Sequence, residues 1–385
     1  MSAPGMSVGE VFQLVREGQA ETRSDIARLT GLSRTAVSLR VNQLIEHRLV
    51  VERAEGGSTG GRPPVRLEFH ATGAVVLAAA VGASRAQYAV CDLAGRILAS
   101  SAVTSDFTEG PDVALRSVVR QLDGLLAAAG RTDADVRGIG VSIPGVVDRV
   151  TGRIVSRPVA PGWDKVEVPE VLGARFPVPV VVENDVNVLA LAEHQAHPGT
   201  DDLVMIKAST GVGVAIIADG RLVRGAVGAA GEIGHTKIGG DRVCRCGATG
   251  CLEAYAGGWA LARELGVADA RAVGDLVRAR HPEALRAIRD AGRRIGEVAS
   301  GVVNLLNPAA IVVSGDIVSD GLVAGIRELT YQQSTDVATR GLTIEASTLD
   351  DQAALAACVV MILDDLLSPD AIDNLTSPPS RSARS

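Results

Sequence analysis

Two neighbouring stretches decide the fold of this protein: Gly228-Ala-Ala-Gly-Glu-Ile-Gly-His235 and Cys244-Arg-Cys-Gly-Ala-Thr-Gly-Cys251-Leu-Glu253. The second stretch places three thiols within eight residues, and His235 offers a fourth ligand. Three cysteines and one histidine form a closed tetrahedral set, which is typical of structural zinc. The alternative, three unligated thiols in a loop, would expose reactive groups without gain. The spacing therefore predicts a structural Zn²⁺ site formed by His235, Cys244, Cys246 and Cys251.

Length and composition limit the class of protein. A chain of 385 residues with 46% hydrophobic and 22% charged residues predicts two or three globular domains. The longest apolar stretches are shorter than a membrane helix, and the first residues lack a secretory signal, so we expect a cytoplasmic protein without a membrane partner. Five cysteines are too few for a disulfide framework. The net charge of −7 means that any contact with DNA is local. Arginine outnumbers lysine 35 to 3, which we attribute to a GC-rich coding sequence.

A pattern of three short apolar strands occurs twice in the chain. Each trio contains a hairpin turn, Asp92–Gly95 in the first and Asp219-Gly220 in the second. Helical periodicity and a buried strand follow each trio, which predicts an α/β body with two similar lobes and a cleft. The predicted strands of the two trios are Val75–Gly82, Ala86–Cys91 and Arg96–Ser101, then Leu203–Lys207, Gly213–Ala218 and Arg221–Val223.

The N-terminal residues have the spacing of a helix-turn-helix. Thr22 is placed to cap one helix, Gly31 to form the turn, and Ser33 to cap a second helix over residues 34–47. The outer face of that second helix could reach the DNA major groove through Ser33, Arg34, Thr35 and Ser38. We expect a small core formed by Ile26, Leu29, Leu32, Val37, Val41, Leu44 and Ile45.

A wing is expected after the second helix. Two strands within residues 49–69 flank a Gly-, Ser- and Pro-rich segment, where Arg62 could enter a minor groove. Arg40 lies where a hydrophobic residue is expected, so either the helix is rotated or Arg40 extends toward a DNA phosphate. The alternative to DNA binding is a helical hairpin that contacts other proteins.

The two opening stretches resemble the signature of the ROK family of repressors, open reading frames and sugar kinases. Further matches extend the resemblance over the body: Gly138-Ile-Gly-Val-Ser-Ile-Pro-Gly145, Glu183-Asn-Asp-Val-Asn187, Ser209-Thr-Gly-Val-Gly213 and Asn307-Pro308. The resemblance implies a two-lobed body of the actin/hexokinase-like (ribonuclease H-like) class. It also implies sugar contacts from Asn184, Asp185, Glu232, His235 and Glu253, with His235 serving both zinc and sugar.

One departure separates this chain from the kinases of the family. Asp185 matches the kinase base, but the kinase loop aspartate-x-glycine-glycine-threonine reads Ala80-Val-Gly-Ala-Ser84 here, and Ser314-Gly315 replaces a later glycine pair. No acidic group remains at Ala80 to hold Mg²⁺. We therefore expect a sugar-responsive repressor without catalytic residues, in which Asp185 is a vestigial base. The alternatives are an ATP-dependent sugar kinase, either alone or as one function of a bifunctional protein, and an adaptor that binds only proteins.

The expected organisation has four parts. Residues 1–70 form a winged helix-turn-helix, 71–190 and 191–376 form the two lobes, and 377–385 are a disordered tail. The expected partners are operator DNA, a small sugar effector, and further copies of the chain in a homodimer or homotetramer.

Overall fold

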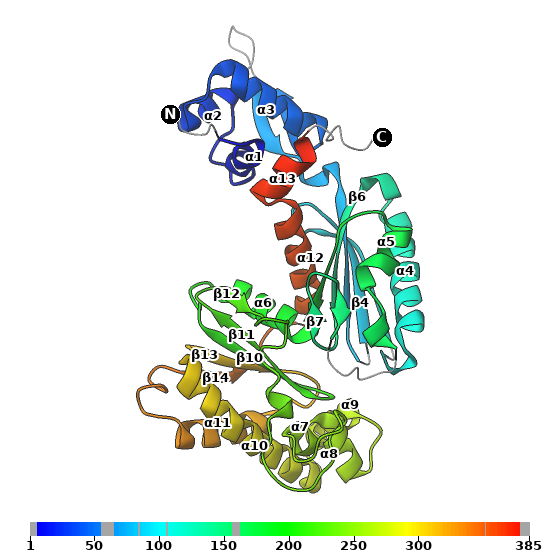
Figure 1. The fold of residues 1–385 in the computed structure, drawn as a ribbon, viewed down its shortest axis with the longest axis vertical. Helices are drawn as coiled ribbons and strands as arrows, with labels where there is room; N and C mark the ends of the chain where they lie inside the picture. The colour runs from blue at the N-terminus through cyan, green and yellow to red at the C-terminus, as the bar shows by residue number, and fades with distance from the viewer. Residues whose placement is uncertain are drawn as a thin grey trace.

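The computed structural model describes residues 6–54, 65–83, 85–104, 107–155, 162–350 and 352–377. The predicted wing segment with Arg62 and the predicted disordered tail after Ser377 lie outside these residues. Figure 1 shows the N-terminal helices at one end of an elongated molecule, followed by two sheet-containing lobes. Among the described helices, none combines the length and the apolar character needed to cross a bilayer.

Residues 8–54 and 65–69 form three helices and a two-stranded sheet, which we call the reader. Its elements are α1 (Val8–Arg16), α2 (Arg23–Thr30), α3 (Arg34–Glu46), β1 (Val50–Ala54) and β2 (Val65–Phe69). The predicted caps are present, because the Asp25 amide donates to Thr22 Oγ1 and the Ala36 amide donates to Ser33 Oγ. Gly31 has φ of 70°, the left-handed conformation that ends α2 and turns the chain into α3.

The core of the reader differs from the expectation at one position. Ile26, Val37 and Val41 are fully buried, as predicted, but Leu29 is 47% exposed. Leu29 was assigned to the core from its spacing alone. A helix of only eight residues buries a single narrow stripe, and in α2 that stripe is centred on Ile26.

The first lobe contains a five-stranded sheet in the order β5-β4-β3-β6-β9. Its strands are β3 (Val75–Val81), β4 (Arg85–Asp92), β5 (Ile97–Thr104), β6 (Val136–Ile143) and β9 (Val180–Asn184). The strands β3, β4 and β5 pair antiparallel, whereas β6 pairs in parallel with β3 and β9 pairs in parallel with β6. The helices α4 (Pro111–Ala128) and α5 (Val168–Arg175) cover one face. A small hairpin, β7 (Val147–Asp148) with β8 (Arg153–Ile154), follows β6.

The second lobe repeats this strand order as β12-β11-β10-β13-β14. Its strands are β10 (Leu203–Ala208), β11 (Val212–Ala218), β12 (Arg221–Val223), β13 (Ala310–Ser314) and β14 (Thr343–Ala346). The helix α6 (Asp185–Ala196) covers one face. The other face packs on α8 (Gly258–Leu265), α9 (Ala270–Arg278), α10 (Pro282–Leu306) and α11 (Asp320–Gln333). The predicted two-lobed α/β body is therefore confirmed.

The last two helices return to the first half of the molecule. The helix α12 (Ala353–Leu366) packs on the first sheet, on the face opposite α4. Gly140 makes this close packing possible, because a Cβ there would lie 2.2 Å from the Cys358 carbonyl oxygen. The helix α13 (Pro369–Thr376) then contacts α1 of the reader (Figure 1). This arrangement differs from the expected division, which placed residues 191–376 together in the second lobe.

One hydrophobic core joins the reader to the body. Phe12 and Ile26 of the reader belong to the same buried cluster as Val76 of the first sheet, Ile362 of α12 and Ile372 of α13. Burial of apolar side chains is the main stabilising contribution to folding, so the reader and first lobe form one packed unit.

Candidate functional site

The four predicted metal ligands lie together. Their donor atoms are all within 4.8 Å of one another. Cys244 Sγ lies 3.7 Å from His235 Nδ1, and Cys246 Sγ lies 3.7 Å from Cys251 Sγ. A tetrahedron with zinc–sulfur bonds of about 2.3 Å has edges of roughly 3.8 Å, so these separations fit a bound metal. The structure thus supports a metal site formed by one histidine and three cysteines.

His235 connects the metal site to the acidic residues beside it. Its Nδ1 faces Cys244, whereas its Nε2 lies 3.7 Å from Glu232 Oε2. Although the Glu232 side chain is 43% exposed, desolvation by the surrounding residues raises its pKa, His235 opposes this shift, and the charge of Glu253 adds to it. The glycines of the motif allow the approach, since a Cβ on Gly231 would lie 1.9 Å from a carbonyl oxygen of β11.

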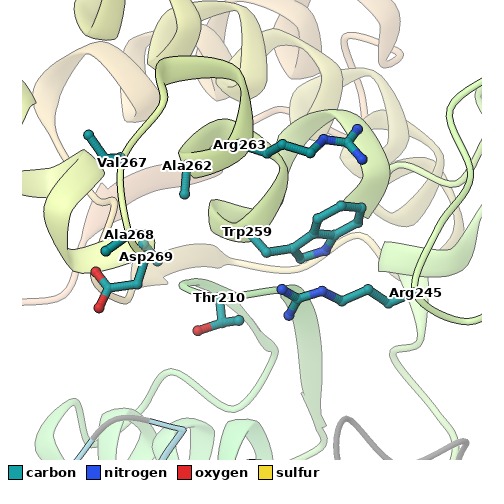
Figure 2. A pocket seen from close by; sticks show the side chains of 9 residues that line it. Thr210, Arg245, Trp259, Ala262, Arg263, Val267, Ala268 and Asp269 are labelled. Carbon is teal, nitrogen blue, oxygen red and sulfur yellow. The ribbon is translucent and has the colours of Figure 1, made fainter.

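Glu253 begins the short helix α7 (Glu253–Ala256) and is held from two directions. Its Oε2 accepts the Val212 amide at 3.2 Å, and its Oε1 accepts Trp259 Nε1 at 3.2 Å. The indole of Trp259 lies beside a pocket of about 280 Å³ that also includes Arg245 and Thr210 (Figure 2). Three of the predicted sugar-contacting residues, Glu232, His235 and Glu253, are therefore brought together in the second lobe.

Asn184 and Asp185 lie at the junction of β9 and α6, where the chain leaves the first sheet. Asn184 caps α6, because its Oδ1 accepts the main-chain amides of Val186 and Asn187, and its side-chain Nδ2 donates to the Gly145 carbonyl at 2.7 Å. Asp185 Oδ2 accepts a hydrogen bond from Lys207 Nζ at 2.5 Å. The structure thus gives Asn184 a capping task that the resemblance did not indicate.

Sequence reasoning missed two cations at this junction, Lys207 and Arg224. Lys207 comes from β10 of the second sheet, and Arg224 follows β12. Arg224 Nε donates to Glu183 Oε2 at 2.7 Å. The rarity of lysine in an arginine-rich chain was an available signal for Lys207, whereas nothing in the local pattern marks Arg224.

The DNA-facing candidates on α3 fall into two groups. Arg34 and Thr35 are exposed at the start of the helix, and Leu39 is 62% exposed one turn later. Ser33 is engaged as the cap. The predicted set also includes Ser38, which is partly buried and whose carbonyl accepts Arg23 Nη1.

Arg40 is partly buried, and main-chain carbonyls engage its guanidinium. Its Nε donates to the Met6 carbonyl at 2.8 Å, and its Nη1 donates to the Ala36 carbonyl at 3.1 Å. Arg40 therefore holds the chain that leads into α1. The neighbouring Leu39 takes the outward position, which explains the unusual order of these two residues.

Comparison with known proteins identifies the family to which the two-lobed body belongs. A model of the ROK family matches residues 76–364, which is most of the chain. This chain belongs to the ROK family. The xylose repressor of Caldicellulosiruptor bescii is 28% identical to the ROK chain described here over 381 residues, which span 93% of this chain and 95% of that protein. The DNA-binding transcriptional dual regulator NagC of Escherichia coli is 27% identical over 402 residues, which span 94% and 95%.

Solved ROK structures agree with this assignment. A ROK family transcriptional regulator described as a homologue of the E. coli Mlc protein shares the fold over 95% of this chain and 98% of its own, with a TM-score of 0.77 at 24% identity. A ROK glucokinase from Streptomyces griseus, in complex with glucose and AMPPNP, matches 74% of this chain and 98% of its own, with a TM-score of 0.64 at 25% identity. The regulator structure thus includes the counterpart of the reader.

Proposed function

We propose that this protein is a sugar-responsive transcriptional repressor that binds operator DNA through the reader. The observation that carries the proposal is the continuous core from α1 through α13 and α12 to the first sheet. The last strand of that sheet ends at Asn184, next to Asp185, and the resemblance assigns both residues to sugar. A change in the relative position of the lobes can therefore be transmitted to α3 through packed side chains. Relatives named as repressors support the same function.

The regulatory mechanism follows from where the sugar-contacting residues lie. Asn184 ends the first sheet and Asp185 begins α6, whereas Glu232, His235 and Glu253 belong to the second lobe. A sugar that contacts both groups favours one arrangement of the lobes. It shifts the equilibrium only if it binds that arrangement more tightly than the other. In a homodimer or homotetramer, the shift changes the spacing of paired readers on a two-fold operator.

The metal of the His235 and cysteine site is, in this proposal, structural Zn²⁺. Zinc with four protein ligands leaves no open position for catalysis and instead fixes the surrounding loops. His235 Nδ1 and the three thiolates would hold it. The orientation of His235 Nε2 toward Glu232 then presents that nitrogen to the sugar, because ligation determines the tautomer of the ring.

An ATP-dependent sugar kinase is the second candidate, favoured by Asp185 and by the glycine-rich segment Ser209–Gly213. Two features oppose it. Ala80 offers no ligand for magnesium, and the carboxylate of Asp316 contacts the Ser209 hydroxyl. Phosphoryl transfer depends on electrostatic stabilisation of phosphate oxygens, which a carboxylate at this loop would repel. A regulator without kinase activity is therefore the proposal we favour.

A gel-shift titration tests the proposed function. The protein first selects its own binding sequence from a random duplex library, and the selected duplex is then titrated with and without D-xylose, D-glucose or N-acetyl-D-glucosamine. We expect specific binding that one sugar weakens. No specific DNA binding, with or without sugar, would refute the proposal.

A further inference from the structure

Two cations of the second lobe contact the end of the first sheet. Lys207 pairs with Asp185, and Arg224 pairs with Glu183, with nitrogen–oxygen distances of 2.5 and 2.7 Å. The lobes also meet nearby, because a Cβ on Gly228 of the second lobe would lie 2.4 Å from the Val147 carbonyl oxygen of β7. The segment 183–185 is therefore the place where the second lobe meets β9.

The two ion pairs differ in what they leave free. The Glu183 side chain is only 4% exposed, and its Oε1 also accepts the Asn184 amide and Asn187 Nδ2. This carboxylate is fully used inside the protein. The side chains of Lys207 and Asp185 remain 21% and 15% exposed. Within the described ranges, neither forms another side-chain hydrogen bond.

The donors and acceptors that Lys207 and Asp185 leave unused match the hydrogen-bonding groups of a sugar hydroxyl. An ammonium has three donors, of which Asp185 uses one, and the carboxylate keeps a second oxygen that can accept. A sugar hydroxyl is both a donor and an acceptor. It can donate to Asp185 and accept from Lys207 at the same time, so both hydrogen-bonding functions of the hydroxyl are satisfied when it leaves water.

We propose that Lys207 is a further effector-binding residue, which holds jointly with Asp185 one hydroxyl of an unphosphorylated sugar. This inference rests on the proposed function. The choice of a neutral ligand follows from charge, since three of the residues that the resemblance assigns to sugar, Asp185, Glu232 and Glu253, are carboxylates. A phosphate monoester would add two negative charges beside these carboxylates. Lysine suits this position because the charge of its ammonium is concentrated on one nitrogen, whereas the guanidinium of arginine is a wider planar group.

The experiment compares three variants by ligand-induced thermal shift and isothermal titration. Lys207→Met keeps the length of the apolar stem, Lys207→Arg keeps the charge, and Lys165→Met is the matched control because Lys165 is an exposed lysine of the first lobe. The ligands are D-glucose, D-xylose and N-acetyl-D-glucosamine, the monodeoxy forms of whichever sugar binds, and D-glucose 6-phosphate. Unfolding without ligand checks that each variant is folded.

We expect Lys207→Met to weaken sugar binding about 10- to 100-fold, as for loss of a hydrogen bond to a charged group. Lys207→Arg should recover part of the loss, and Lys165→Met should bind like the wild type. With the wild-type protein, one deoxy sugar should bind much more weakly than its parent sugar. With Lys207→Met, the same deoxy sugar and its parent should bind with nearly equal affinity. A purely structural lysine would not produce that selectivity for one hydroxyl.

Four results would overturn the inference. Folded Lys207→Met with wild-type sugar affinity would show that the ammonium does not contact the ligand. If every deoxy sugar lost the same affinity relative to its parent, in the wild type and in Lys207→Met alike, the weaker binding of Lys207→Met would be a structural effect. Tighter binding of D-glucose 6-phosphate than of D-glucose would contradict the neutral ligand. If no sugar binds the wild type while specific DNA binding persists, the sugar-sensing part of the proposed function fails, and this inference fails with it.

Discussion

The main-chain amide of Gly9, in the first turn of α1, donates a hydrogen bond to Asp373 Oδ1 of α13 at 2.8 Å, across 364 residues of sequence. Two further bonds reinforce this contact between the ends of the chain. Gln13 Nε2 donates to the Leu367 carbonyl, and Gln43 Nε2 of α3 donates to the Thr376 carbonyl. The helix α3, which carries the proposed DNA-contacting residues, is thus tied to α13, and α13 follows the helix α12 that covers the first sheet.

Substitution Gly9→Ala tests this junction. A Cβ at Gly9 would lie 2.0 Å from the Pro369 carbonyl oxygen, so α1 and α13 must separate. We expect a loss of about 1–3 kcal/mol in the free energy of unfolding, as for overpacking of a core. Gly124→Ala in α4 is the control, because its Cβ meets no atom within 4 Å and alanine stabilises a helix by roughly 0.5–1 kcal/mol relative to glycine. Urea denaturation of both variants distinguishes them, and equal stability would exclude a tight junction.

The metal site is tested by metal analysis of the purified protein. We expect about one zinc ion per chain, in line with a closed four-ligand site. Cys251→Ser should abolish the zinc content and lower the midpoint of thermal unfolding, since the loop loses its cross-link. Cys358→Ala is the control, because Cys358 is buried under the first sheet and lies outside the cluster. Full zinc content in Cys251→Ser would contradict the assignment.

Kinase activity is tested by coupled ADP release with ATP, Mg²⁺ and the three sugars. We expect no release above that of Asp185→Asn, because Ala80 lacks a carboxylate and the carboxylate of Asp316 contacts Ser209. A ROK glucokinase assayed in parallel serves as the positive control. Sugar-dependent release that Asp185→Asn abolishes would instead identify the chain as a kinase.

The DNA-facing surface of α3 is tested by substitution of Arg34 and Leu39. Loss of a base contact costs about 1–3 kcal/mol, and Leu39 is suited to the apolar methyl group of thymine. We therefore expect each alanine variant to bind the selected duplex roughly 5- to 150-fold more weakly. Arg286→Ala, at an exposed position of α10, should bind normally. If Arg34→Ala and Leu39→Ala bound the duplex with unchanged affinity, the DNA interface would not include this face of α3.

Features carried by local spacing were predictable from the sequence. The four metal ligands, the caps at Thr22 and Ser33, and the two strand trios lie within short stretches, where residue type and periodicity determine the structure directly. The error at Leu29 arose within the same approach, because periodicity marks a face of a helix but not how wide the buried stripe is.

Tertiary structure alone decided the contacts between distant segments. Four such contacts join residues whose local sequence patterns do not predict the pairing. They are the packing of α12 on Gly140, the hydrogen bond between Gly9 and Asp373, and the ion pairs of Lys207 with Asp185 and of Arg224 with Glu183. Such contacts depend on how whole elements are arranged around a core, and only the folded chain brings them within reach. The sequence by itself determined which chemical groups the protein carries, and the tertiary fold decided which of them meet.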